Sequence, residues 1–324
     1  MVTILKINFT FVPKGCIIGL SFLFSESFTK VKKGSHMIHF IINPKAKRGK
    51  IRKKVTTLEN LLHEKKIDYA LHYTTAKGVA TDLAREFSKE PESTVVAVGG
   101  DGTINEVLNG LNTENARFGI IPSGTGNDFI ASAKIPLDVE KALDLILNGE
   151  ARPTDYMVCD GVRGLNIIGT GIDVDILNRC RKSKILKGKL QYVVSLIISL
   201  IKFKFYKFFI EKNGEMLEKE GLIVAVGNGS QFGGGIKMCP KAIIDDGLLD
   251  FVVAGKVKKR KIPGAFIKLM KGKVLELDFA TFERKERVRI DFEKPVTIQI
   301  DGELYDGLKF DVSVVKNGIR IFRP

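Results

Sequence analysis

The amino-acid sequence predicts two regions of different fold class, a parallel α/β region from Met37 to about residue 155 and an antiparallel β region after it. Strand-like and helix-like segments alternate in the first region, which is typical of a parallel sheet covered by helices. The second region consists mainly of strand-like segments joined by Asn-Gly, Asp-Gly and glycine-rich turns. With 324 residues, 44% of them hydrophobic, the chain is long enough for one large or two medium domains.

The composition is basic and poor in cysteine. Lys and Arg exceed Asp and Glu by 52 − 37 = 15, which suggests an anionic partner such as phospholipid, nucleic acid or a phosphorylated small molecule. The four cysteines form no CxxC pair, and the four histidines form no HExxH pattern. A zinc site and a disulfide framework are therefore disfavoured, and we expect a protein of the reducing cytoplasm.

Residues 1–36 differ from the rest of the chain. Their apolar segment is interrupted by Pro13, Lys14 and Gly15, so it falls short of the roughly 20 apolar residues that a transmembrane helix needs. A signal peptide is conceivable, but no small-residue cleavage site stands out. Because Met37 directly precedes a buried strand, we expect residues 1–36 to be a non-native or disordered extension outside the working protein.

Hydrophobic spacing predicts each element of the α/β region. Val55, Leu58, Leu61 and Leu62 recur at helical spacing, whereas residues 68–75 alternate like a strand. A glycine after residue 148 is a typical helix stop. The expected elements, in chain order, are strand Ile38–Ile42, helix 53–67, strand 68–75, helix 76–90, strand Val95–Val98, a strand and loop within 117–129, and helix 138–150.

The β region contains strand-like segments and one helical interruption. The helical interruption is 188–203, inside which Tyr192–Ile201 is apolar but too short to span a membrane; it fits a buried helix. The strand-like segments are 156–161, 163–172, 204–214, 220–230, 247–255, 287–307 and 308–322.

A glycine-rich turn, Gly99 to Thr103, follows the strand Val95–Val98. Glycines can turn consecutive N–H groups into one concavity, and the helix that begins near Ile104 adds its positive end. Asp101 would repel a phosphate there unless it contacts a metal, a lysine or backbone amides. The alternative is a tight turn without a ligand, with Thr103 capping the helix.

A second glycine loop, Pro122–Phe129, follows the next strand. Ligands of parallel sheets bind at the carboxyl ends of strands, so two neighbouring loops of this kind favour a phosphate and ribose site. The sequence contains no GxxxxGK[ST], no GxGxxG that opens a helix after a strand, and no protein-kinase motif set. P-loop enzymes and protein kinases are thereby excluded.

Five segments together resemble the soluble bacterial diacylglycerol kinase and lipid kinase family, whose relatives include sphingosine kinases and, distantly, NAD kinases. The resemblance covers Met37 to Pro324. It implies an α/β, Rossmann-like nucleotide domain at 37–155, to which a tail at 312–324 returns, and an antiparallel β-sandwich-like lipid domain at 156–311. The five segments are INPKAKRGK, VGGDGTINEVLNGL, PSGTGNDF, MCPKAIIDDGLLD and IQIDGELY.

The resemblance also implies which residues form the site. A structural Mg²⁺ would be held by Asp246 and the backbone carbonyls of Ile243 and Leu248, although Asp-Gly is equally a plain turn signal. ATP would bind in the cleft between the domains. In the segment HYTTAKG the contact is assigned to Thr74, and its neighbour Thr75 is the alternative. The implied ATP contacts are Asn43, Thr74, Gly99, Gly100, Asp101, Gly102, Thr103, Ile104, Asn105 and Thr125.

Transfer of a phosphoryl group to an alcohol needs a carboxylate near the attacking hydroxyl. The family places this proton acceptor in the DGE segment, so Glu303 and Asp301 are the candidates, with Glu303 slightly preferred. In an extended segment the two face the same side, so the second could orient the base or hold metal. Asp101 would orient metal or phosphates.

The resulting expectation is an ATP- and Mg²⁺-dependent lipid kinase that converts diacylglycerol to phosphatidic acid. The alternatives are a soluble NAD-kinase-like enzyme and a non-catalytic basic membrane-binding module. The basic stretches 179–212 and 256–273 suggest peripheral attachment to the anionic inner face of the membrane. No nucleic-acid-binding signature accompanies them, and the resemblance makes a homodimer plausible.

Overall fold

The computed structural model describes residues 37–46, 51–172, 174–175, 179, 194–195, 197–199, 205–212 and 214–324. The expectation for residues 1–36 and most of the predicted helix 188–203 lie outside the described residues.

The first region is built on four parallel strands in the order β2-β1-β3-β4. Every residue of β3 is buried, because helices cover both faces of the sheet and a strand inside it needs apolar side chains on both sides. The strands are β1 (Ile38–Ile42), β2 (Tyr69–Tyr73), β3 (Thr94–Gly99) and β4 (Arg117–Pro122).

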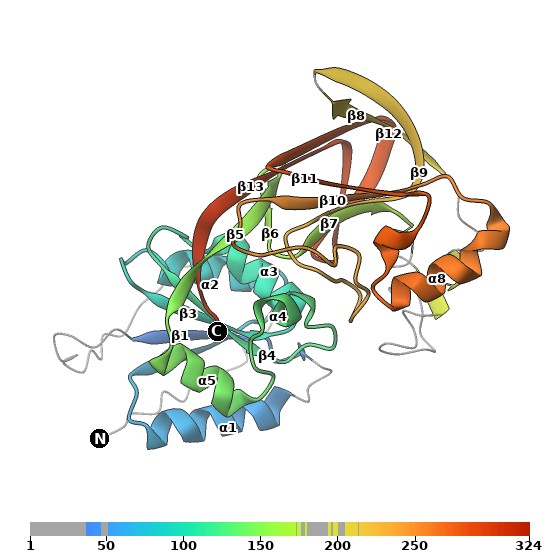
Figure 1. Cartoon of the computed structure of the whole chain (residues 1–324). Coiled ribbons are helices and arrows are strands. Elements are labelled where there is room, and N and C mark those ends of the chain that lie inside the picture. The colour runs from blue at the N-terminus through green and yellow to red at the C-terminus, as the bar shows by residue number, and fades with distance from the viewer. Residues whose placement is uncertain are drawn as a thin grey trace, which may run out of the picture. The chain divides into compact units, whose positions relative to one another are not determined.

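The helices divide between the two faces of this sheet. Alternate residues of β1 separate the two cores: Phe40 and Ile42 pack with α1 and α5, whereas Ile41 packs with α2, α3 and α4. Figure 1 shows α1 and α5 on one side of the strands and α2 and α3 on the other. The helices are α1 (Ile51–Glu64), α2 (Val79–Phe87), α3 (Asp101–Gly110), α4 (Asp128–Ala133) and α5 (Val139–Asn148).

The second region is antiparallel and β-rich. One apolar cluster, which includes Phe208, Phe251 and Phe310, forms its core, and a second cluster lies under α8 and includes Leu269. The elements are β5 (Ala151–Cys159), β6 (Val162–Gly164), β7 (Ile167–Gly171), β8 (Tyr206–Lys212), β9 (Glu215–Gly227), β10 (Leu249–Gly255), η2 (Lys259–Lys261), α8 (Ile262–Met270), η3 (Val274–Glu276), β11 (Ala280–Lys285), β12 (Arg287–Ile300) and β13 (Glu303–Phe322).

The fold class predicted from the sequence is confirmed, a parallel α/β region followed by an antiparallel β-sandwich-like region. The two regions share strands. β13 pairs antiparallel with β12 and β5 in the β-rich region, and its Arg320 and Ile321 pair parallel with β4. The boundaries expected at 155/156 and 311/312 therefore fall inside the continuous strands β5 and β13 (Figure 1).

Candidate active site

A pocket of about 350 Å³ lies at the carboxyl ends of the parallel strands. The loops after β1, β2, β3 and β4 all contribute to its wall, as expected for a parallel sheet. Glu303, from the start of β13, brings the β-rich region to the same pocket. The lining residues are Asn43, Lys45, Ala46, Thr74, Thr75, Ala76, Lys77, Ala80, Gly100, Gly102, Thr103, Glu106, Gly124 and Glu303.

The structure brings together only some of the predicted nucleotide contacts. Asn43, Thr74, Gly100, Gly102 and Thr103 line the pocket. Five other predicted contacts do not line the pocket, because their side chains or backbones are engaged elsewhere or point away from it. These five are Gly99, Asp101, Ile104, Asn105 and Thr125.

The glycines of the first loop are needed for close contact and not for unusual backbone angles. None of Gly99, Gly100 and Gly102 has a positive φ. A Cβ on Gly99 would lie 2.4 Å from the Thr103 Oγ1 atom, and one on Gly100 would lie 2.9 Å from the Gly124 Cα atom. The two glycine loops therefore touch, and a side chain on either would separate them.

The N-terminus of α3 opens toward the pocket without a side-chain cap. Its N-cap residue is Gly100, and the helix has no side-chain cap hydrogen bond, so Thr103 is not the cap considered from the sequence. The Thr103 hydroxyl instead accepts from Asn43 Nδ2 at 3.2 Å. The first turn, with Gly102 in the pocket wall, presents the positive end of the helix dipole.

Asp101 and Asp128, called here the loop-anchoring aspartates, hold the second glycine loop in place. Both carboxylate oxygens of Asp101 accept backbone N–H groups, from Asn127 at 2.9 Å and from Asp128 at 3.0 Å. Asp128 in turn accepts from Gly234 N at 2.9 and 3.0 Å. Burial raises the pKa of Asp101, and burial followed by the charge of Asp101 raises the pKa of Asp128 to about 6.

Ile104, Asn105 and Thr125 have positions other than the pocket wall. Ile104 is buried in the core under α2 and α3. The Asn105 amide donates to the Arg163 carbonyl at 3.2 Å and to Asp301 at 3.4 Å, and Thr125 is exposed. Gly124, the neighbour of Thr125, lines the pocket in its place.

The two candidate bases have different environments. The Asp301 carboxylate accepts the backbone N–H groups of Leu165 (2.7 Å), Asn166 (3.0 Å) and Ile167 (3.0 Å). Burial raises the pKa of Asp301 to about 6, and these N–H groups act in the opposite direction. Glu303 lines the pocket and pairs with Lys77 at 2.6 Å. Of the two candidate bases, Glu303 is therefore the one that a ligand in the pocket can reach.

Residues 243–248, which were expected to hold a structural Mg²⁺, lie against the positive charge of Arg284. One Asp246 oxygen accepts from Leu248 N at 3.0 Å, and the other pairs with Arg284, whose Nε also contacts the buried Asp250 at 3.1 Å. One carboxylate and two carbonyls suit Mg²⁺ in kind. However, both oxygens of Asp246 are engaged, so these residues do not fit a Mg²⁺ ion in this arrangement.

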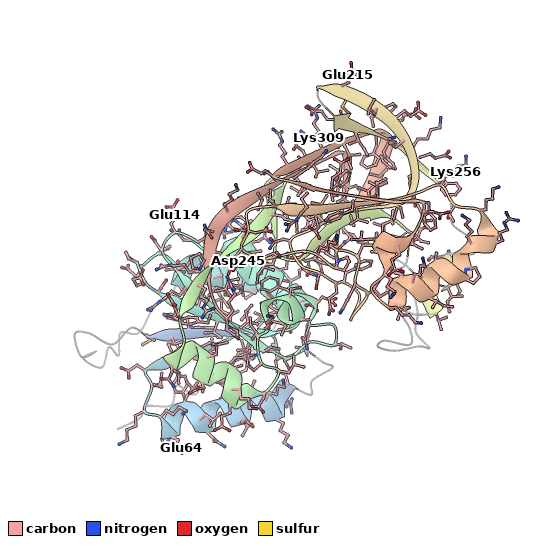
Figure 2. All side chains as sticks on the ribbon, viewed as in Figure 1. Glu64, Glu114, Glu215, Asp245, Lys256 and Lys309 are labelled. Carbon is pink, nitrogen blue, oxygen red and sulfur yellow. The ribbon has the colours of Figure 1, made fainter. Side chains whose placement is uncertain are left out.

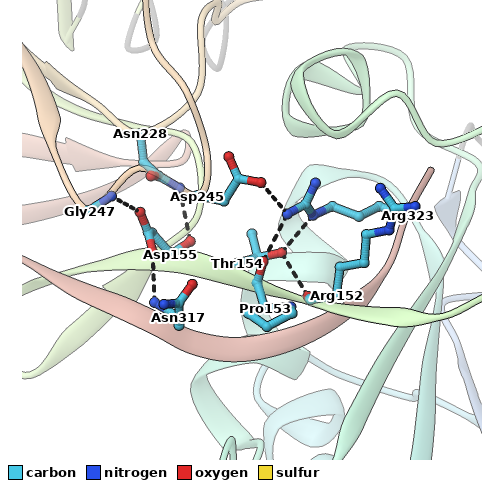
Figure 3. Close-up of polar contacts among 9 residues, drawn as sticks. All are labelled: Arg152, Pro153, Thr154, Asp155, Asn228, Asp245, Gly247, Asn317 and Arg323. Atoms are coloured by element: carbon cyan, nitrogen blue, oxygen red, sulfur yellow. Dashed lines mark hydrogen bonds and ion pairs between the residues drawn. The ribbon is translucent and has the colours of Figure 1, made fainter.

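The same segment is anchored to the strands shared by the two regions (Figure 3). The fully buried Asp155 accepts from Gly247 N at 2.6 Å and from Asn317 N at 2.7 Å. Arg323, near the chain end, pairs with Asp245 at 2.6 Å. The segment is thus fixed to β5 and β13 by buried and charge-assisted hydrogen bonds.

Sequence reasoning missed three charged residues of the pocket, Lys45, Lys77 and Glu106. Glu106 accepts from Gly78 N at 3.1 Å and so holds the loop before α2 against α3. Lys77 lies directly before Gly78, whose φ is +89°. A glycine after a lysine in a strand-to-helix loop was the available signal for a turn that faces the strand ends.

Comparison with known proteins matches nearly the whole described chain. The sequence pattern of the diacylglycerol kinase catalytic domain matches residues 37–159, and that of the YegS C-terminal NAD kinase β-sandwich-like domain matches residues 166–323. The chain is 29% identical to the diacylglycerol kinase of Bacillus subtilis (strain 168), over 83% of this chain and 89% of that protein. It is 33% identical to a protein named as a YegS-like lipid kinase from Enterobacter (strain 638), over 78% and 85%.

Solved structures agree with these matches. The crystal structure of a Bacillus anthracis (strain Sterne) protein assigned as a diacylglycerol kinase superimposes with a TM-score of 0.74 at 25% identity. The match covers 90% of this chain and 99% of that one.

Proposed function

Because the chain belongs to the diacylglycerol kinase and YegS-like lipid kinase family, we propose that it transfers the γ-phosphoryl group of ATP to the hydroxyl of diacylglycerol and forms phosphatidic acid. One observation carries the proposal. A pocket lined by both glycine loops and the uncapped start of α3 also contains a carboxylate, Glu303, contributed by the β-rich region.

The pocket has the size expected of a ligand-binding cleft, and its wall carries Lys45 and Lys77 beside Glu106 and Glu303. Ligand pockets of proteins are commonly about 300–1,000 Å³, and this one is about 350 Å³. Gly102 and Thr103, in the first turn of α3, would contact phosphate oxygens, and Lys45 and Lys77 add positive charge to the wall. Asp101 does not touch the nucleotide in this account; it fixes the second loop beside it.

Glu303 would act as the proton acceptor. It removes the proton from the lipid hydroxyl as that oxygen bonds to the γ-phosphorus, and the bond from this phosphorus to the β-phosphate oxygen breaks. The products are a phosphate monoester, ADP and protonated Glu303. Mg²⁺ that accompanies the nucleotide would neutralise charge on its phosphates. Asp301 would position Glu303 by fixing the turn before β13.

The lipid is held in a bilayer, so the enzyme must dock at its surface. No helix in the described part of the chain is long and apolar enough to cross a membrane. On α8, Ile267 and Met270 are 54% and 43% exposed, and they share one face of the helix. We propose that this face docks peripherally on the anionic, cytoplasmic side of the membrane.

Basic side chains around α8 support this docking mode. Lys258, Arg260 and Lys271 are exposed and, within the part of the chain that the structure describes, form no ion pair. Lys256, labelled in Figure 2, lies just before η2 at the same end of the region. Each basic residue near an anionic surface contributes about 1 kcal/mol, and exposed apolar side chains between them can enter the interface.

The test is phosphate transfer from labelled ATP with Mg²⁺ to a panel of lipids in anionic mixed micelles, with NAD as a parallel acceptor. Label in phosphatidic acid is the expected result. Label in another lipid alone would support the assignment as a lipid kinase but show that its substrate is not diacylglycerol. Label in NAD alone would show a soluble NAD-kinase-like enzyme. No label, with retained binding to anionic vesicles, would show a non-catalytic membrane-binding module.

A further inference from the structure

Lys77 and Glu303 face each other across the pocket and form an ion pair. The Lys77 Nζ atom lies 2.6 Å from the Glu303 Oε2 atom, and both residues line the pocket wall. Lys77 belongs to the loop between β2 and α2, whereas Glu303 begins β13. The pair therefore connects the two regions at the place where phosphoryl transfer is proposed.

The backbones of both residues are held, but the lysine side chain has room to move. Gly78, next to Lys77, donates its N–H to Glu106, and Glu303 follows the turn that Asp301 fixes with three backbone hydrogen bonds. The side chain of Lys77 is 76% exposed and that of Glu303 only 26%. A long flexible ammonium arm thus reaches over a carboxylate whose backbone is fixed.

In the empty pocket, the ion pair with Lys77 opposes the proposed role of Glu303 as the proton acceptor. The Glu303 Oε2 atom accepts a hydrogen bond from the Lys77 ammonium group at 2.6 Å, so while the pair holds this oxygen is occupied and does not meet the lipid hydroxyl. A triphosphate in the pocket offers Lys77 a stronger partner. A terminal phosphate carries about two negative charges near neutral pH, against one on the carboxylate.

We propose that Lys77 exchanges its partner during the reaction, from Glu303 in the empty pocket to the terminal phosphate when ATP is bound. The exchange frees Glu303 to accept the lipid proton only in the nucleotide complex, and it places a positive charge on the group being transferred. The inference rests on the proposed function, since it needs ATP in this pocket.

A comparison of the affinities for ATP and ADP distinguishes a partner exchange by Lys77 from an ion pair that stays intact when nucleotide binds. Calorimetric titrations with Mg²⁺ would compare the wild type with Glu303→Gln, Lys77→Met and the double variant. Because the carboxylate competes with ATP for the ammonium group, Glu303→Gln should tighten ATP binding by about two- to fivefold. In the Glu303→Gln background, Lys77→Met should reduce the preference for ATP over ADP by about tenfold.

Lys45→Met is the matched control, since Lys45 lines the same pocket and, among the described residues, forms no ion pair with Glu303. Its effect on ATP affinity should be the same with and without Glu303→Gln. Lys77→Arg should retain most of the ATP preference because it keeps the charge. An ATP-to-ADP ratio unchanged by Lys77→Met in the Glu303→Gln background would overturn the exchange. A wild type that binds no ATP would overturn the proposed function as well.

Discussion

Asp301→Asn should destabilise the protein although the two side chains have nearly the same shape. The carboxylate accepts four hydrogen bonds, from the backbone N–H groups of Leu165, Asn166 and Ile167 and from the Asn105 amide. An asparagine offers one oxygen and one NH₂ group. Whichever way the amide turns, its NH₂ group faces two donors and leaves them without an acceptor.

The cost follows from the burial of those donors. Leu165, Asn166 and Ile167 are at most 5% exposed, and each buried donor left unpaired costs about 1–3 kcal/mol. Part of this is offset because the variant no longer buries a charge, so we expect a loss of about 2–4 kcal/mol in the free energy of unfolding. For a protein of this size that lowers the melting temperature by about 3–7 °C.

Thermal and urea unfolding followed by circular dichroism would measure this difference. Glu303→Gln is the matched control, because it makes the same chemical change in a carboxylate whose ion pair with Lys77 is partly exposed. That variant should lose less than about 1 kcal/mol. The reasoning would be refuted if Asp301→Asn had the melting temperature of the wild type while Glu303→Gln was strongly destabilised. Asp301 would then not be the structural carboxylate of the two.

Four further predictions follow from individual contacts. Gly126→Ala puts a methyl group 2.8 and 3.2 Å from the oxygens of the loop-anchoring aspartates, so ATP affinity measured by titration should fall about tenfold or more. Replacing Ile267 and Met270 together by Asn should weaken co-sedimentation with anionic vesicles while transfer to a short-chain, monomeric diacylglycerol persists. Burial lowers the pKa of His72 from 6.5 to about 4, so the folded state binds fewer protons and wild-type stability falls as pH drops through this window; His72→Gln should show a smaller fall in urea unfolding. Because Arg284 already neutralises the expected metal segment, a chelator should leave the wild-type melting temperature unchanged, whereas Arg284→Met should gain stability from added Mg²⁺.

The sequence predicted the features that depend on local pattern. Alternating elements predicted the parallel sheet, and the glycine loops after Val98 and Pro122 predicted where its strand ends would form a pocket. The family resemblance added the DGE segment, of which Glu303 lines that pocket. The limits of the two regions were less predictable, because a long strand such as β13 can serve two sheets without any local signal.

The features that sequence reasoning missed depend on distant partners. Asp101 was considered as a metal or phosphate ligand, but its oxygens are taken by N–H groups from residues 26 and 27 positions later. Asp246 has the oxygen chemistry of a metal ligand, yet Arg284, which lies 38 positions away, occupies it. Lys77 belongs to no motif, and Glu303, with which it pairs in the pocket, lies 226 positions later in the chain.

The most direct test of the central claim is the initial rate of phosphatidic acid formation from diacylglycerol and ATP, measured for the wild type and Glu303→Gln at a temperature where both are folded. We predict that the wild type forms phosphatidic acid and that Glu303→Gln loses about 100-fold or more of this rate, the usual contribution of a general base. A wild type without activity toward diacylglycerol, or a Glu303→Gln variant with undiminished rate, would contradict the account.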